Sequence, residues 1–169
     1  MKRARWLGLV LLAALAACAR LPEPSPPPAQ RRQPVRPLLH YAVMRERSAD
    51  ERIVAGIGRE IHGDWRWAGK NAELRYAVEE PQGIQFEAVL IVTHEFVRAG
   101  GRRIEVLIDG KPLGAIPANQ AGYQAWKHPV PEEWLAPGRE IRVELKADAE
   151  WLEGNEKRGY MLIGAGFTL

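Results

Sequence analysis

The chain has 169 residues, 24 basic and 21 acidic side chains, and a single cysteine. This length holds one domain with additional segments, and a single cysteine excludes an internal disulfide. The surplus of basic over acidic side chains lies near the amino terminus, because from residue 39 onward there are 17 basic and 20 acidic side chains. A nucleic-acid-binding domain carries a surplus of positive charge, so this class of protein is excluded.

The amino terminus has the pattern of a secretory signal peptide, which we place at residues 1–17. Three basic residues precede an apolar run, 6–17, that is too short for a membrane-spanning helix. The run ends in Leu15-Ala16-Ala17-Cys18, which resembles the lipobox of bacterial lipoproteins. The resemblance implies cleavage before Cys18, a diacylglyceryl group on its sulfur and anchoring by palmitate-type acyl chains. The alternative is an ordinary signal peptide followed by a chance cysteine.

A proline-rich segment, residues 18–38, follows the predicted cleavage site. It contains seven prolines, which favour extended polyproline II structure and cannot build a core. At about 3.1 Å per residue such a tether reaches roughly 60 Å. We expect it to carry the following domain away from a membrane of the cell envelope. Ala19 stands where an aspartate often retains Gram-negative lipoproteins at the inner membrane, so the outer membrane is favoured in such a host.

Residues 39–169 predict one β domain. Apolar and polar residues alternate over 72–79, 104–109 and 141–147, which is typical of half-buried strands. Strands this close together, with turns rather than helices between them, indicate an all-β fold, an antiparallel β-sandwich of about eight strands. The turns are expected at Pro81-Gln82-Gly83, Asp109-Gly110 and Pro137-Gly138.

Two further strands have special features. The stretch 84–92 is apolar on both faces, which predicts a central strand. Residues 160–169 predict the last strand, in which Gly164 and Gly166 indicate a bulge or a close approach of backbone. The stretch 48–57 is ambiguous and has room for one helical turn.

Several motifs follow one another in residues 56–169. They are Trp65-Arg66-Trp67 before a strand, the hairpin 107–113, Pro129-Val130-Pro131 before 135–138, and Leu162-Ile163-Gly164 in the last strand. This order resembles the galactose-binding-like jelly-roll domains of bacterial envelope and carbohydrate-active proteins. The resemblance implies a jelly-roll sandwich. The family mixes sugar binders with domains of no known ligand, so the fold does not decide the function.

The sequence has no pattern of a catalytic or metal site. The four histidines, at positions 40, 62, 94 and 128, lack the spacing of metal ligands. His94 and Glu95 are adjacent, so on a strand they would face opposite sides. There is no GxSxG motif, and most acidic residues lie on the polar faces of predicted strands. We therefore expect no enzyme, no metal and no cofactor.

Five tryptophans in the domain are candidates for ligand contacts, because sugar sites combine aromatic rings with polar groups. Trp65 and Trp67 should face the same side, with Trp67 in the core. Trp134 is expected to pack beneath a turn. Trp151 lies in the polar stretch 147–159 and is expected to be exposed, whereas Trp126 fits core and surface equally.

The polar surroundings of Trp126 and Trp151 decide the candidate binding residues. We expect non-catalytic binding of a polysaccharide by an envelope lipoprotein. The alternative is a structural or assembly lipoprotein that binds another envelope protein. A cleft with convergent polar groups favours sugar, and a flat apolar patch or an open edge strand favours a protein. The candidate binding residues are Tyr123, Trp126, Trp151, Asn155 and Arg158.

Overall fold

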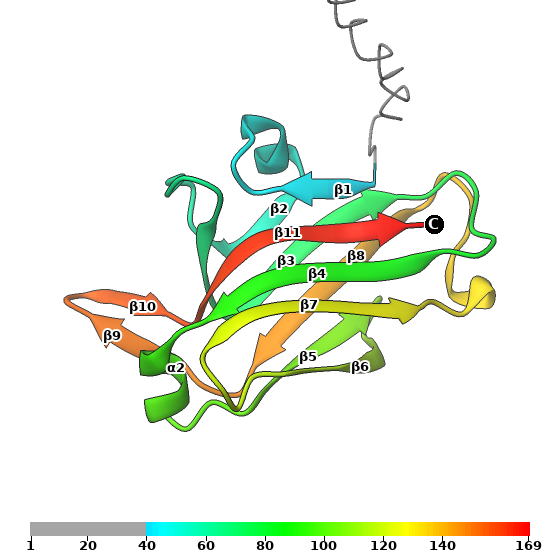
Figure 1. The fold of residues 1–169 in the computed structure, drawn as a ribbon. Helices are drawn as coiled ribbons and strands as arrows, with labels where there is room; N and C mark the ends of the chain where they lie inside the picture. Colours follow the sequence, from blue (N-terminus) through cyan, green and yellow to red (C-terminus); the bar gives the residue numbers. More distant parts are fainter. Residues whose placement is uncertain (1–39) are drawn as a thin grey trace, which may run out of the picture. The chain divides into compact units, whose positions relative to one another are not determined.

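Antiparallel strands dominate the part of the chain that the computed structural model describes, residues 40–169 (Figure 1). The predictions for the signal peptide, Cys18 and the proline-rich tether lie outside these residues. Within residues 40–169 no helix has the length and hydropathy needed to cross a membrane. The predicted class, all-β with antiparallel pairing, is confirmed.

One antiparallel path of strands builds the sandwich, in the order β6-β5-β8-β3-β11-β4-β7. It folds back on itself, so that β6 and β7 at its two ends come into contact. Beside this path, β1 pairs with β11 and β2 pairs with β3. The bounds along the path are β6 (Lys111–Pro117), β5 (Arg103–Ile108), β8 (Glu140–Ala147), β3 (Arg66–Ala77), β11 (Tyr160–Thr168), β4 (Gln85–Val92) and β7 (Gly122–Pro129), with β1 (Tyr41–Val43) and β2 (Ile53–Ile57) beside them.

Strand β3 joins the two layers of the sandwich. Its first residues pair with β11, and its later residues pair with β8. Figure 1 shows β1, β11, β4 and β7 side by side in one layer, with β5, β6 and β8 in the other. A separate hairpin of β9 (Trp151–Glu153) and β10 (Glu156–Arg158) connects β8 to β11.

The predicted alternation is confirmed, because the apolar positions of β3, β5 and β8 face the core. Eight strands have five or more residues, in agreement with the expected number, and three strands of three residues were not predicted. The fully buried side chains from both layers include Leu74, Tyr76, Phe86, Leu90, Ile104, Ile108, Ile141, Leu145 and Tyr160.

The turns lie where the sequence predicts them. Asp109 and Gly110 close the hairpin of β5 and β6 with φ angles of 48° and 76°. A two-residue hairpin turn with both φ angles positive matches the right-handed twist of its strands. This explains why the turn carries an Asp-Gly pair.

The two glycines of β11 provide both features that were expected of them. The register with β4 shifts between Leu162 and Gly164, which is a bulge. A Cβ added at Gly164 would lie 2.6 Å from the ring of Tyr41, and one at Gly166 would lie 2.2 Å from the carbonyl oxygen of His40. Bulkier residues would therefore push β1 away from β11.

Two short helices differ from the expectations. The ambiguous stretch holds both a 3-10 helix, η1 (Arg47–Glu51), and strand β2. His94 and Glu95, which were treated as strand residues, lie in a short helix, α2 (His94–Arg98), so that premise was wrong. The helix forms because the Thr93 side chain accepts a hydrogen bond from the backbone N–H of Phe96 at 3.2 Å.

Among the described residues, Arg66 is a charged side chain that is fully buried. Its Nε donates to the carbonyl oxygen of Met44 at 2.8 Å, and its Nη2 donates to that of Glu46 at 3.0 Å. Its Nη1 forms an ion pair with Asp50, and this hydrogen bond holds the pKa of the Asp50 carboxyl below its ordinary value. The guanidinium therefore fastens residues 44–50 onto β3.

Adjacent positions on β8 test the assignment of its faces. Leu145 is fully buried, and Lys146 points outward to Glu144. Leu145→Ala should lower the free energy of unfolding by about 2–5 kcal/mol because it leaves a cavity. Lys146→Ala should change it by less than about 0.5 kcal/mol, as is usual for surface positions. Urea unfolding measures both, and equal costs would contradict the assigned faces.

The ion pair of Asp50 predicts a pH dependence of stability. Because the pKa of Asp50 is lowered in the folded protein, its contribution is present above the ordinary value of 3.8 and is lost as the pH falls toward the folded value. Asp50→Asn should remove this part of the acid destabilisation, as followed by urea unfolding at neutral and acidic pH. Asp64→Asn is the control, because Asp64 is exposed and pairs with Arg45 at 3.6 Å. Identical acid profiles for wild type and Asp50→Asn would contradict the prediction.

Candidate functional site

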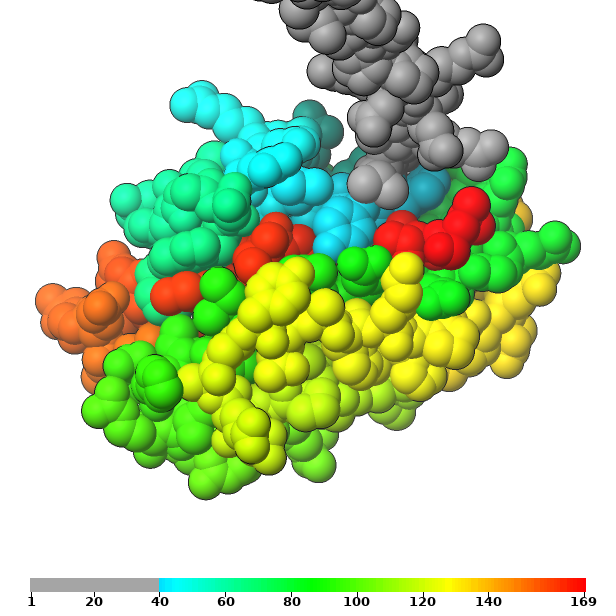
Figure 2. Space-filling model, in the orientation of Figure 1, coloured from blue at the N-terminus to red at the C-terminus, as the bar shows by residue number. Residues whose placement is uncertain are grey.

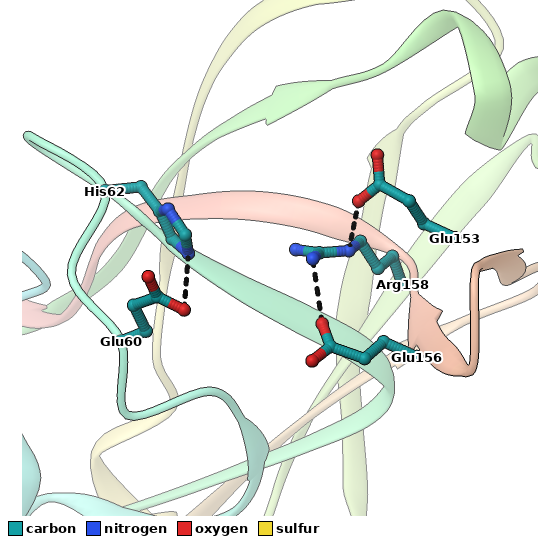
Figure 3. Close-up of polar contacts among 5 residues, drawn as sticks. All are labelled: Glu60, His62, Glu153, Glu156 and Arg158. Atoms are coloured by element: carbon teal, nitrogen blue, oxygen red, sulfur yellow. Dashed lines mark hydrogen bonds and ion pairs between the residues drawn. The ribbon is translucent and has the colours of Figure 1, made fainter.

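A pocket of about 660 Å³ opens between the end of β2 with its following loop, the middle of β3, and the hairpin of β9 and β10. Polar and charged side chains enter it from both sides (Figure 3). The lining residues are Gly56, Ile57, Gly58, Arg59, Glu60 and His62 on one side, Trp67, Gly69, Lys70 and Asn71 on β3, and Glu150, Glu156, Lys157 and Arg158 on the other.

Irregular pairing of β2 with β3 makes room for the pocket. Ala55 pairs with Glu73 and Ile57 pairs with Ala68, so β3 contributes more residues than β2 between the two pairs. Gly56 lies at this irregularity with φ +70°, and a Cβ there would lie 1.7 Å from a backbone oxygen of β3. Only glycine fits such a close approach. The extra residues of β3, among them Gly69, Lys70 and Asn71, line the pocket beside this close approach.

An aromatic cluster forms one wall of the pocket. The ring of Trp67 meets Trp65 and Trp151 edge to face, with centroid distances of 5.0 and 5.5 Å. His62 stacks on Trp65 at 4.7 Å. The guanidinium of Arg158 lies 4.5 Å from the centre of the Trp67 ring, a cation–π contact. These contacts hold the hairpin of β9 and β10 against β3.

Ion pairs fix the charged side chains of the hairpin. The Nε of Arg158 lies 2.6 Å from a carboxylate oxygen of Glu153, and its Nη2 donates to Glu156 at 2.8 Å. Lys157 pairs with Glu150 at 3.2 Å. Figure 3 shows Arg158 reaching from the hairpin toward the side of the pocket that carries His62 and Glu60. The charges on this wall are thus largely balanced and held in place.

The opposite wall is formed by the loop that follows β2. His62 lies 3.7 Å from a carboxylate oxygen of Glu60. Lys70 and Asn71 add further polar groups from β3. The pocket therefore presents hydrogen-bond donors and acceptors together beside an indole ring. Among residues 40–169, no group of three or more His, Cys, Asp or Glu is placed to hold a metal ion.

The structure separates the five predicted binding residues into two groups. Arg158 lines the pocket, Trp151 packs beside its aromatic wall, and Asn155 is exposed in the turn between β9 and β10. Tyr123 and Trp126 lie on β7 instead and face opposite sides of it. Tyr123 is 64% exposed, whereas Trp126 packs against the core. Ligand binding by these residues stays a prediction.

The other expectations for the tryptophans have mixed outcomes. Trp65 and Trp67 do face the same side. The core position expected for Trp67 is wrong, because Arg66 takes the buried side of β3 and leaves Trp67 half-buried on the outer side. Trp134, expected beneath a turn, ends a short 3-10 helix, Glu132–Trp134, and is partly buried against the core. Trp151 is half-buried on a strand rather than exposed in a loop.

Reasoning from the sequence missed the loop side of the pocket. Glu60, His62 and Lys70 were not among the candidates, although all three line it. A signal was present in the glycines at 56 and 58, which interrupt an edge strand, and in Gly69 after Trp67. Glycines inside a strand pattern often mark a bulge or a close approach.

Comparisons with known proteins give loose structural likenesses. No family model and no curated protein matches the chain. A family 35 carbohydrate-binding module from Clostridium thermocellum is similar at 7% identity and TM-score 0.42, over 70% of this chain and 92% of that one. The tandem CBM51 modules of a Streptococcus pneumoniae family 98 glycoside hydrolase are similar at 16% identity and TM-score 0.37, over 62% and 31%.

An exo-β-1,3-galactanase from Phanerochaete chrysosporium, solved with β-1,3-galactotriose, is similar at 11% identity and TM-score 0.37. That match covers 69% of this chain and 25% of the galactanase, so the chain spans only a part of it and of the CBM51 protein. TM-scores this low describe a loosely shared arrangement of strands. We therefore derive the function from the pocket alone.

Proposed function

We propose that this domain binds a polysaccharide without catalysis and that the pocket beside Trp67 is its binding site. The observation that carries the proposal is the convergence of donors and acceptors around an indole ring in an open pocket. Sugars combine hydroxyl groups, which both donate and accept, with apolar C–H faces that pack on aromatic rings. The pocket offers both kinds of contact.

Particular side chains suit each kind of sugar contact. Arg158, Lys70 and Asn71 supply N–H donors, and the carboxylates of Glu60 and Glu156 accept from hydroxyls. The ion pairs of Arg158 hold its guanidinium in one orientation before a ligand arrives, which reduces the entropy lost on binding. Paired charges also leave the hairpin wall close to neutral, which suits a ligand that is rich in hydroxyls.

A second candidate function is assembly with another envelope protein. Strand β2 pairs only with β3 within residues 40–169, so its other edge is open. It also carries Val54, which is 48% exposed. An open edge with an exposed apolar side chain is a template for another strand. The polar pocket favours polysaccharide binding. A protein partner would instead pair with the open edge of β2.

The location of the protein rests on its first 18 residues. We infer a lipid anchor at Cys18 and a place in the cell envelope, on the outer membrane in a Gram-negative host. The pattern Leu15-Ala16-Ala17-Cys18 and the tether after it support this proposal. More than one acyl chain is needed for stable anchoring, since each buried methylene contributes about 0.8 kcal/mol.

Replacing Cys18 with serine should prevent lipidation and release the protein into the soluble fraction, because the thiol is the group that takes the lipid. Metabolic labelling with a tagged fatty acid and membrane fractionation measure this outcome. Wild-type protein that takes up no label would refute the anchor.

Filling the pocket tests the binding site without removing a contact. Gly69 lies on the same face of β3 as Trp67, and a Cβ there would meet only the Gly56 carbonyl oxygen, at 3.7 Å. Gly69→Leu should therefore project into the pocket and weaken glycan binding at least about tenfold, or 1.4 kcal/mol. Its free energy of unfolding should change far less than that of a core variant.

The matched control is Ala115→Leu, which adds the same side chain at an exposed position on β6. Binding is measured on a glycan array and then by titration with the glycan that the wild type binds best. Wild-type protein that binds no glycan refutes the proposed function. Unchanged binding by Gly69→Leu refutes this pocket as the site.

A further inference from the structure

A row of side chains leads from the pocket across the sheet. Trp67 on β3 pairs with Met161 on β11, Met161 pairs with Ile91 on β4, and Ile91 pairs with Tyr123 on β7. Directly paired residues of antiparallel strands have their side chains on the same face. These four side chains, named here the outer row, therefore lie on one face, and Trp67 at one end belongs to the pocket.

The outer row faces solvent and not the core. The sequence neighbours of its middle members, Leu90 and Leu162, are fully buried, so Ile91 and Met161 point the other way. Both are half-buried on this face, and Tyr123 is 64% exposed. Adjacent strands lie about 4.8 Å apart, so the row extends roughly 14 Å from Trp67 to Tyr123.

The outer face of the opposite layer has a different composition. Ion pairs cover it, among them Arg142 with Glu73 at 2.9 Å and Lys146 with Glu144 at 3.2 Å. Such charged pairs are the usual surface of a sheet that meets water. An apolar row on the other outer face is not needed for solubility, and an exposed apolar feature of this kind is typical of a binding surface.

Small or buried residues lie beside the outer row on the same face of the sheet. Val89 and Ala125 pair with each other in the next row, and the ring of Tyr41 lies over Gly164. Burial raises the pKa of the Tyr41 hydroxyl, and Glu87 and Tyr123 add to this effect. In Figure 2, β11 (red) and β4 (green) show as a strip between β7 (yellow) and β1 (cyan).

We propose that the outer row binds an extended glycan chain, one end of which occupies the pocket while later sugar units lie over Met161 and Ile91 as far as Tyr123. This inference rests on the proposed function and assigns it a chain rather than a single terminal sugar. The row is one side chain wide and continuous with a polar pocket. A stable protein interface needs about 800 Å² per partner, which so narrow a row does not provide.

The test compares glycan fragments of graded length on wild-type protein and Tyr123→Ala. A fragment array of microbial and plant polysaccharides supplies the probe, and titration follows with one- to six-unit fragments of the glycan bound best. Tyr123→Ala should weaken binding of the longest fragment about tenfold and leave binding of the shortest unchanged, because only the long chain reaches the far end of the row. Gly69→Leu should weaken both.

The matched control is Leu152→Ala. Leu152 is 67% exposed, and on β9 it faces away from Trp151 and hence from the aromatic wall. Its removal should leave the affinity for every fragment unchanged. Equal affinity of wild type and Tyr123→Ala for the longest fragment overturns the outer row as a binding surface. Wild-type protein that binds no fragment on the array refutes the proposed function itself, a result distinct from the first.

Discussion

The buried guanidinium of Arg66 determines which face of β3 turns toward the pocket. Two backbone carbonyls and the carboxylate of Asp50 accept its hydrogen bonds, and a shift of β3 by one residue would separate all three from their donor. Such a shift would also turn Trp65 and Trp67 inward, because side chains alternate between faces. An unpaired buried charge costs several kcal/mol, so the register is strongly specified. The aromatic wall follows from this one buried interaction.

The pocket depends on that register in a second way. With Trp67 outward, the hairpin of β9 and β10 can pack its Trp151 and Arg158 against the exposed indole. On the other side, the irregular pairing at Gly56 brings the backbones of β2 and β3 close together and leaves extra residues of β3, Gly69 to Asn71, that line the pocket. The aromatic wall, the hairpin with its paired charges and the bulge thus come together from β2, β3 and the hairpin of β9 and β10, which are distant from one another in the sequence.

The two outer faces of the sandwich differ in composition, although strands of both layers contribute to one apolar core. Around β8, ion pairs within the strand and with the neighbouring β3 cover the sheet, such as Lys146 with Glu144 and Arg142 with Glu73. Around β4 and β11, apolar and small residues take the corresponding places, with the Glu87–Lys127 pair toward one end. Core formation requires only the inward alternation, so the composition of the outward positions is free to serve binding. This freedom explains how one face can remain a solvated surface while the other leads into the pocket.

The sequence by itself determined the class of fold, several of the long strands, the predicted turns and the inward faces of β3, β5 and β8, because alternation and turn chemistry are local properties. It did not reveal β7. Polar surroundings in the sequence also singled out Arg158, which lines the pocket, whereas Trp151 was expected in an exposed loop and lies half-buried on β9. Only the tertiary structure decided that Trp67 faces outward, that Trp126 belongs to the core while Tyr123 does not, and that Glu60 and His62 meet the hairpin. Those outcomes depend on partners distant in the sequence, such as the carbonyls of Met44 and Glu46 for Arg66. A pattern of neighbours carries no information on which remote acceptor a buried donor will find.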